Sequence, residues 1–134
     1  MPEVSPVAPP FRLQGEVAPL AFDTTLSSAG DALIALTGEL DLSGTPALDE
    51  EIDRLADARG VRRVVLDLRE LEFMDSSGLR LVALAERRLT AAGRALVLVR
   101  GAETVQRVFA ITRMEEHLHF VDSPDALGAD GAAA

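Results

Sequence analysis

The spacing of hydrophobic residues changes along this chain. In the first patterned stretch, hydrophobic and polar residues alternate. Leu20, Phe22 and Leu26 fall on one side of an alternating segment, which predicts a half-buried strand with those three side chains facing inward. The residues Ser27–Asp31 predict a turn into a second strand, Ala32–Thr37. The two strands should therefore pair antiparallel at one edge of a sheet.

The rest of the chain alternates short apolar runs with segments of helical spacing. Nearly continuous apolar runs are typical of strands that are covered on both faces, and apolar residues three and four apart are typical of amphipathic helices. The predicted strands are Arg63–Leu68, Arg94–Val99 and His119–Val121. Two predicted helices cover Ser77–Ala92 and Glu103–Ile111, and two more are predicted to begin at Thr45 and at Ser123.

Strands that alternate with helices of this length predict parallel βαβ units with right-handed crossovers. The predicted fold class is α/β, with a mixed, mostly parallel sheet of about four to five strands, an antiparallel first strand and flanking helices. Five of the seven prolines lie in residues 1–19, which we interpret as a flexible N-terminal extension. One domain should cover residues 20–127, and the small, polar segment 128–134 should be a disordered tail.

Composition narrows the classes of function. The chain has 134 residues, no cysteine and a net charge of −9, and all 13 of its basic residues are arginine. Nucleic-acid binding is not expected, because it needs a basic surface, whereas a protein partner with a basic surface would be attracted. No segment approaches the roughly 20 apolar residues of a membrane span, and no secretory signal is evident. These features favour the cytoplasm and no membrane.

Two loops are the candidate functional regions, because loops beyond the carboxyl ends of parallel strands carry function in such sheets. They are Gly38–Gly44, with Glu39 and Asp41, and Glu70–Ser77, which leads into the second helix. The two acids could sit in a solvated turn or contact a partner, and their position on the same rim as the second loop favours a partner.

Ser76 could do chemistry or only cap a helix. Of the two serines, Ser77 is the predicted cap. Asp75 could orient the Ser76 hydroxyl or satisfy backbone amides of the loop, and Gly78 could keep the approach to the serine open or allow close packing. Thr45 is predicted to cap the first helix.

The G-x-S-x-G context of a hydrolase nucleophile is absent around Ser76, so an enzyme is not expected.

Cofactors and metals are not expected either. Asp67 lies in a predicted buried strand without a second ligand at metal spacing, so a hydrogen bond to a loop is its predicted role. His117 and His119 supply only two possible ligands. No Gly-rich phosphate-binding motif is present, so ATP should not bind.

Three motifs occur in register along the chain: L-T-G-E-L-D at Leu36–Asp41, V-V-L-D-L at Val64–Leu68 and F-M-D-S-S-G-L at Phe73–Leu79. Together they resemble those of the STAS domain family, and specifically its bacterial anti-sigma factor antagonists. The resemblance covers Leu20–Leu127. It departs from the family at Arg113, where many members carry a glycine.

The resemblance implies a binding module without an active site of its own. Such a protein binds an anti-sigma factor that is also an ATP-dependent serine/threonine kinase, and thereby frees a sigma factor. The kinase would phosphorylate the serine that maps to Ser76 and so end the complex, and a serine phosphatase would restore it. The alternative within the family is a STAS scaffold subunit of a larger stress-signalling or regulatory assembly.

Overall fold

The computed structural model describes residues 18–127, and the predictions for the extension and the tail fall almost entirely outside that range. Five strands form one sheet in the order β1-β2-β3-β4-β5, in which β1 is antiparallel to β2 and the other pairs are parallel. The strands are β1 Ala21–Leu26, β2 Asp31–Leu40, β3 Arg63–Met74, β4 Ala95–Val99 and β5 Phe120–Val121. The α/β fold class is therefore confirmed.

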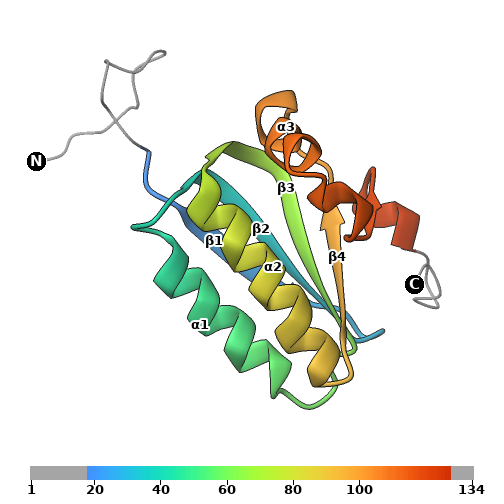
Figure 1. The fold of residues 1–134 in the computed structure, drawn as a ribbon. Coiled ribbons are helices and arrows are strands. Elements are labelled where there is room, and N and C mark those ends of the chain that lie inside the picture. Colours follow the sequence, from blue (N-terminus) through green and yellow to red (C-terminus); the bar gives the residue numbers. More distant parts are fainter. Residues whose placement is uncertain (1–17, 128–134) are drawn as a thin grey trace, which may run out of the picture.

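Three α-helices and two short 3-10 helices complete the domain. They are α1 Thr45–Ala56, α2 Ser76–Ala91, α3 Glu103–Ile111, η1 Met114–Glu116 and η2 Pro124–Leu127. Figure 1 shows α1 and α2 side by side across one face of the sheet, with α3 beside the upper part of β3 and β4. No helix within residues 18–127 is both long and apolar enough to cross a membrane.

Alternation along the strands divides the buried residues between two layers. In β2, Ile34 and Leu36 are fully buried in the main core under the helices, and Leu33 packs against a smaller cluster on the opposite face. This division follows from the period of two in a strand. The smaller cluster consists of Val65, Val97, Val99 and Leu127.

The first strand departs from the prediction at its last residue. Phe22 packs against the core as expected, but Leu26 is 64% exposed. Leu26 pairs with Ala32 next to the turn at the end of the hairpin. An alternating pattern identifies the face of a strand but not how far the covering layer extends along it, so the sequence could not show that Leu26 lies beyond the core.

Both central strands run further than predicted. The expected loops began at Gly38 and Glu70, but β2 continues to Leu40 and β3 to Met74, and these two buried residues are paired in the parallel ladder. Polar residues on the outward side of a strand do not end it. Glu39 consequently lies within β2 and not in a loop.

The end of α3 shows how the chain accommodates its departure from the family pattern. Arg113 has φ 64°, the left-handed conformation that glycine adopts most easily. Its Nε donates a hydrogen bond of 2.9 Å to Glu116 Oε2. The turn after α3 therefore forms with arginine in the place where glycine is common.

Candidate functional site

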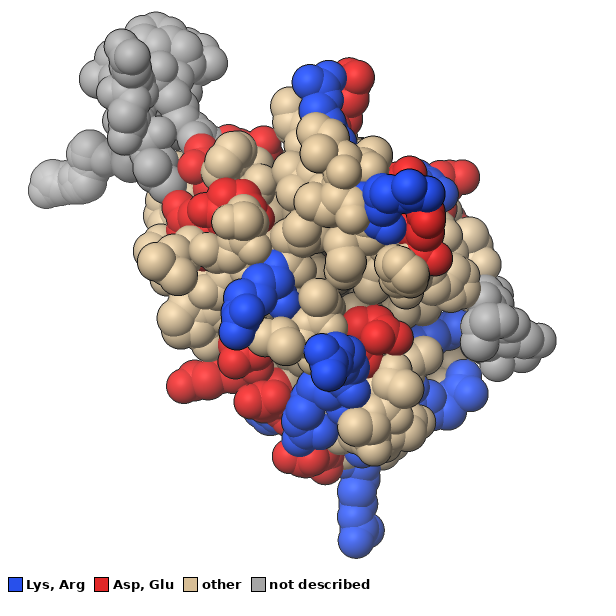
Figure 2. Space-filling model, viewed as in Figure 1, with Lys and Arg blue, Asp and Glu red and all other residues tan. Residues whose placement is uncertain are grey.

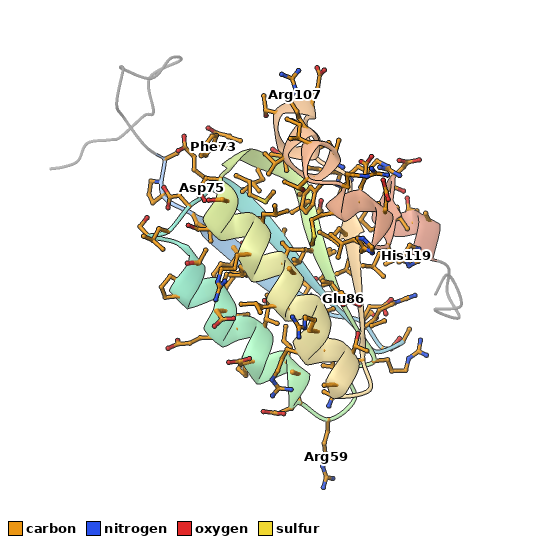
Figure 3. The ribbon with its side chains drawn as sticks, viewed as in Figure 1. Arg59, Phe73, Asp75, Glu86, Arg107 and His119 are labelled. Atoms are coloured by element: carbon orange, nitrogen blue, oxygen red, sulfur yellow. The ribbon has the colours of Figure 1, made fainter. Side chains whose placement is uncertain are left out.

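The carboxyl ends of β2 and β3 bring the two candidate segments together. Leu40 and Met74 are partners in the ladder, and Asp75 N donates a hydrogen bond of 3.2 Å to Leu40 O. The segments that follow the two strands therefore start side by side. Figure 3 shows Phe73 and Asp75 at this end of the molecule, where α2 begins.

Asp75, and not Ser77, caps α2. The backbone of Asp75 is extended, and its Oδ1 accepts hydrogen bonds from Ser77 N at 2.8 Å and Gly78 N at 3.3 Å. The carboxylate thus satisfies amides that have no partner within the helix. The prediction of Ser77 as the cap was wrong, because the helix begins one residue earlier and places Ser77 inside its first turn.

This cap leaves Ser76 at the surface as the first residue of α2. Ser76 is exposed, whereas Asp75 and Ser77 on either side are half-buried. Within residues 18–127 no hydrogen bond involves its hydroxyl. The Ser76 Oγ is therefore accessible to a second protein.

Gly78 supports this arrangement from below. It is buried, and a Cβ there would lie 2.5 Å from Met74 Cγ and 2.9 Å from Leu40 Cγ. Glycine allows the first turn of α2 to lie directly on the ends of β2 and β3. Of the two predicted roles of Gly78, close packing is the one that the structure has.

Asp41 organises the turn between β2 and α1. Its Oδ1 accepts hydrogen bonds from Ser43 Oγ at 2.7 Å and Ser43 N at 3.1 Å. The bond from the Ser43 hydroxyl is the largest cause that lowers the pKa of Asp41, so its charge persists at neutral pH. Asp41 is half-buried in a turn that it shapes itself.

The cap of α1 also differs from the prediction. Gly44 occupies the N-cap, and Thr45 is the first helical residue. The Thr45 hydroxyl donates to Leu42 O at 3.2 Å and not to an amide of the helix. Proline is at the start of α1, as expected, but the tight turn around Asp41 moves the cap one residue earlier.

Glu39 and Phe73 are neighbours across the ladder between β2 and β3. Glu39 is half-buried, and Phe73 is 45% exposed. Figure 2 shows acidic side chains gathered at this end of the molecule, next to surface without charged side chains. The structure thus brings the predicted residues together on one rim: Glu39, Asp41, Asp75, Ser76, Ser77 and, beneath them, Gly78.

A groove of about 350 Å³ opens between the first turns of α1 and α2, beside Ser76. Its walls are Leu42, Thr45, Pro46, Asp49, Ser77, Arg80, Leu81 and Leu84. Leu42 is 73% exposed and Leu84 45% exposed. Exposed apolar side chains that cluster beside polar ones are typical of interaction surfaces.

Sequence reasoning missed the apolar part of this surface. In the sequence Phe73 stands out only as part of a motif, and the hydrophobic pattern assigns no surface role to Leu42 or Leu84. Leu42 could have been found, since an apolar side chain between Asp41 and Ser43 in a short turn has no strand or helix face to join. Leu84 could not, because its exposure depends on where α1 lies.

The remaining polar candidates have structural roles. Burial of Asp67 raises the pKa of its carboxyl, but hydrogen bonds from the side chain and backbone of Arg69 lower it more, to a pKa below the usual value. The predicted partner was a loop, but Arg69 lies in the same strand as Asp67, because β3 continues beyond the point where the loop was expected. Within residues 18–127 no group of three metal-binding side chains exists, so His117 and His119 do not belong to such a cluster.

Comparisons with known proteins match the same region. A model of the STAS domain matches residues 24–126. BtrV of Bordetella bronchiseptica, named as a candidate anti-sigma factor antagonist, is 33% identical over 106 residues, which are 78% of this chain and 90% of that protein.

Two solved structures of SpoIIAA are also similar. The anti-sigma factor antagonist SpoIIAA in its unphosphorylated form is 26% identical with a TM-score of 0.69, and the match covers 80% of this chain and 93% of that one. The phosphorylated form, described as a Bacillus cell-fate determinant, is 25% identical with a TM-score of 0.64, covering 80% and 96%. The matched residues 24–126 contain both candidate segments.

Proposed function

The chain belongs to the STAS domain family, and from this premise we propose that it is an anti-sigma factor antagonist switched off by phosphorylation of Ser76. In the unphosphorylated state it binds an anti-sigma factor that is also a serine/threonine kinase, and a sigma factor is released. A serine phosphatase resets the switch. The cytoplasm, where a sigma factor acts, is the proposed location.

The observation that carries this proposal is the exposed Ser76 hydroxyl on a surface that suits a protein partner. The hydroxyl stands at the start of α2 with no hydrogen bond among the described residues. Exposed Phe73 and Leu42 offer apolar contact area on the same rim. A partner that covers this area must cover Ser76 as well.

The acids of the rim supply electrostatic attraction. Glu39 and Asp41 lie at the end of β2 and in the turn after it, and the chain as a whole has a net charge of −9. Opposite charges across an interface mainly raise the association rate and favour the correct partner. The partner surface should therefore be basic where it meets these two residues.

Phosphorylation replaces the proton of Ser76 Oγ with the γ-phosphoryl group of ATP, and ADP leaves from the kinase. The product carries about −1.5 to −2 charges at neutral pH. The beginning of a helix favours negative charge through its free amides and dipole, so the fold should tolerate the phosphate. The phosphate must therefore act on binding and not on folding.

The magnitudes support a switch of this kind. A serine hydroxyl can be buried against a partner at modest cost when it finds a hydrogen bond, whereas burying a phosphate without matched cations costs several kcal/mol. A loss of about 3 kcal/mol weakens affinity by roughly two orders of magnitude. That change converts a submicromolar complex into one that is mostly dissociated.

The test uses three variants and the kinase that Ser76→Ala captures from the source cell. We expect Ser76→Ala to bind the kinase and resist phosphorylation, Ser76→Asp to bind poorly yet melt near the native temperature, and Ser77→Ala to remain a substrate. Mass spectrometry after treatment with kinase and ATP identifies the modified residue. Phosphate on Ser77, or native affinity of Ser76→Asp, would refute the proposal, and a captured protein without kinase activity would favour the scaffold role.

A further inference from the structure

Arginines in this structure divide into those with polar partners and those without. Among the twelve arginines within residues 18–127, only Arg59, Arg80 and Arg87 make no ion pair or hydrogen bond. Arg59 lies at the end of the molecule furthest from Asp75, as Figure 3 shows. Arg87 is about three turns along α2 from Ser76. Arg80 is the unpartnered arginine near the candidate site.

Arg80 stands four residues after Ser76 on the same helix. Residues at this spacing lie on one face with their Cβ atoms about 5–6 Å apart. Long side chains in a helix also lean back toward its N-terminus, which brings the guanidinium of Arg80 toward position 76. Both residues are exposed, so no rearrangement of the core is needed for them to meet.

Among the described residues, no other arginine without a partner lies near Ser76. The charged groups from the surrounding elements are Glu39 on β2, Asp41 in the turn after it, Asp49 on α1, Glu70 and Glu72 on β3, Asp75 before α2, and Glu103 paired with Arg107 on α3. The serine hydroxyl has no charge with which to hold the guanidinium. A phosphate at the same position would have Arg80 as its one nearby unpaired cation among residues 18–127.

We propose that Arg80 binds the phosphate of phosphorylated Ser76. This inference rests on the proposed function for the phosphate itself, and it concerns how the switch works once the phosphate is present. Two N–H groups of the guanidinium can donate to two phosphate oxygens. Phosphorylation thereby creates an ion pair on the surface of α2 that the unmodified chain lacks.

The pair would change the shape of the docking surface as well as its charge. Arg80 and Ser77 form part of the wall of the groove between α1 and α2. A guanidinium drawn toward position 76 moves away from the part of the wall that it forms. A partner would then meet both an added anion and a groove with a changed wall.

The experiment needs no kinase. Phosphoserine is incorporated at position 76 during translation, and the pKa of the phosphate is measured by ³¹P NMR in the wild type, Arg80→Gln and Arg87→Gln. A nearby cation favours the dianion and lowers the pKa, so Arg80→Gln should raise it by about half a unit. Arg80→Lys should recover part of that difference.

Arg87→Gln is the matched control, because it removes the same unpartnered charge from the same helix. Its phosphate pKa should stay within about 0.1 of the wild type. Equal values in the wild type and Arg80→Gln would overturn the inference, and so would an equal rise in Arg87→Gln, which would indicate only a change in net charge.

The inference and the proposed function fail in different ways. If a kinase modifies Ser76 and the modification ends binding, but Arg80→Gln leaves the phosphate pKa unchanged, only the pair with Arg80 is wrong. If the pKa rises as expected but no kinase binds or modifies the chain, the ion pair stands and the proposed function fails.

Discussion

The two ends of the sheet use their polar side chains in opposite ways. At the amino ends of β2 and β3, Arg63 is 2% exposed and holds Asp31 with two hydrogen bonds of 2.8 Å. Arg62 and Arg94 donate from Nε to the backbone oxygens of Ala29 and Ala56. These arginines link the segments that lie at this end of the sheet: the turn before β2, the start of β2 and the end of α1.

At the carboxyl ends the same sheet leaves its side chains to the solvent. Leu42 and Phe73 are exposed beside the Ser76 hydroxyl, and the side-chain hydrogen bonds of Asp41 and Asp75 stay within the local turn and the helix cap that each residue forms. The difference shows that polar side chains at the amino ends hold separate segments of the fold together. At the carboxyl ends, polar side chains only position the surface around Ser76. Substitutions at the two ends should therefore separate folding from binding.

The largest expected effect on stability comes from the amino end. Asp31→Ala removes the two hydrogen bonds that this carboxylate accepts from the buried Arg63, which should lower the free energy of unfolding by about 3 kcal/mol. Urea denaturation measures this loss. Asp53→Ala removes an exposed partner of Arg88 at 3.6 Å and should cost less than about 1 kcal/mol. Equal losses of stability in both variants would show that the burial of Arg63 does not increase the contribution of its ion pair with Asp31.

At the carboxyl end the largest effect should come from Gly78→Val. Its side chain would overlap Met74 and Leu40, and such overpacking should cost about 2 kcal/mol. Ser77→Val, one residue earlier and half-buried, is the control and should cost much less. A Gly78→Val protein of native stability would mean that α2 can lift from the strand ends.

A smaller effect is expected at the helix cap. Asp75→Ala removes the acceptor for two amides and should cost about 1 kcal/mol. Ser77→Ala should stay within about 0.5 kcal/mol. Thermal melting of the two variants distinguishes them, and the reverse order would restore Ser77 as the cap.

These substitutions also show what the sequence could and could not predict. The turn at Ser27–Asp31, helix α3 and the proximity of Asp41 to Ser76 followed from periodicity and from the shared edge of parallel strands. The choice between Asp75 and Ser77 did not, because both residue types cap helices and only the register of the first turn decides between them. The exposure of Leu26 and Leu84 also depends on where the other layer ends.

The smallest effect should appear in association kinetics. Asp41→Arg removes attraction for a basic partner and should slow association with the kinase a few-fold, with a weaker dependence on salt. Asp57→Arg makes the same charge change at the end of α1 that lies toward the amino ends of the strands, and it should leave the rate nearly unchanged. Stopped-flow or surface-binding kinetics at several salt concentrations would show whether the rates follow position or only net charge.

The most direct test of the account is the hydrogen-exchange footprint of the complex between this chain and its kinase. We expect protection of backbone amides in residues 39–42 and 73–80, with residues 27–31 and 59–63 unchanged. The same measurement on the chain phosphorylated at Ser76 should show no footprint at the same protein concentration. Protection at residues 27–31 and 59–63 in the complex, or a footprint that persists in the phosphorylated chain, would contradict the division between the end that holds the fold and the end that binds.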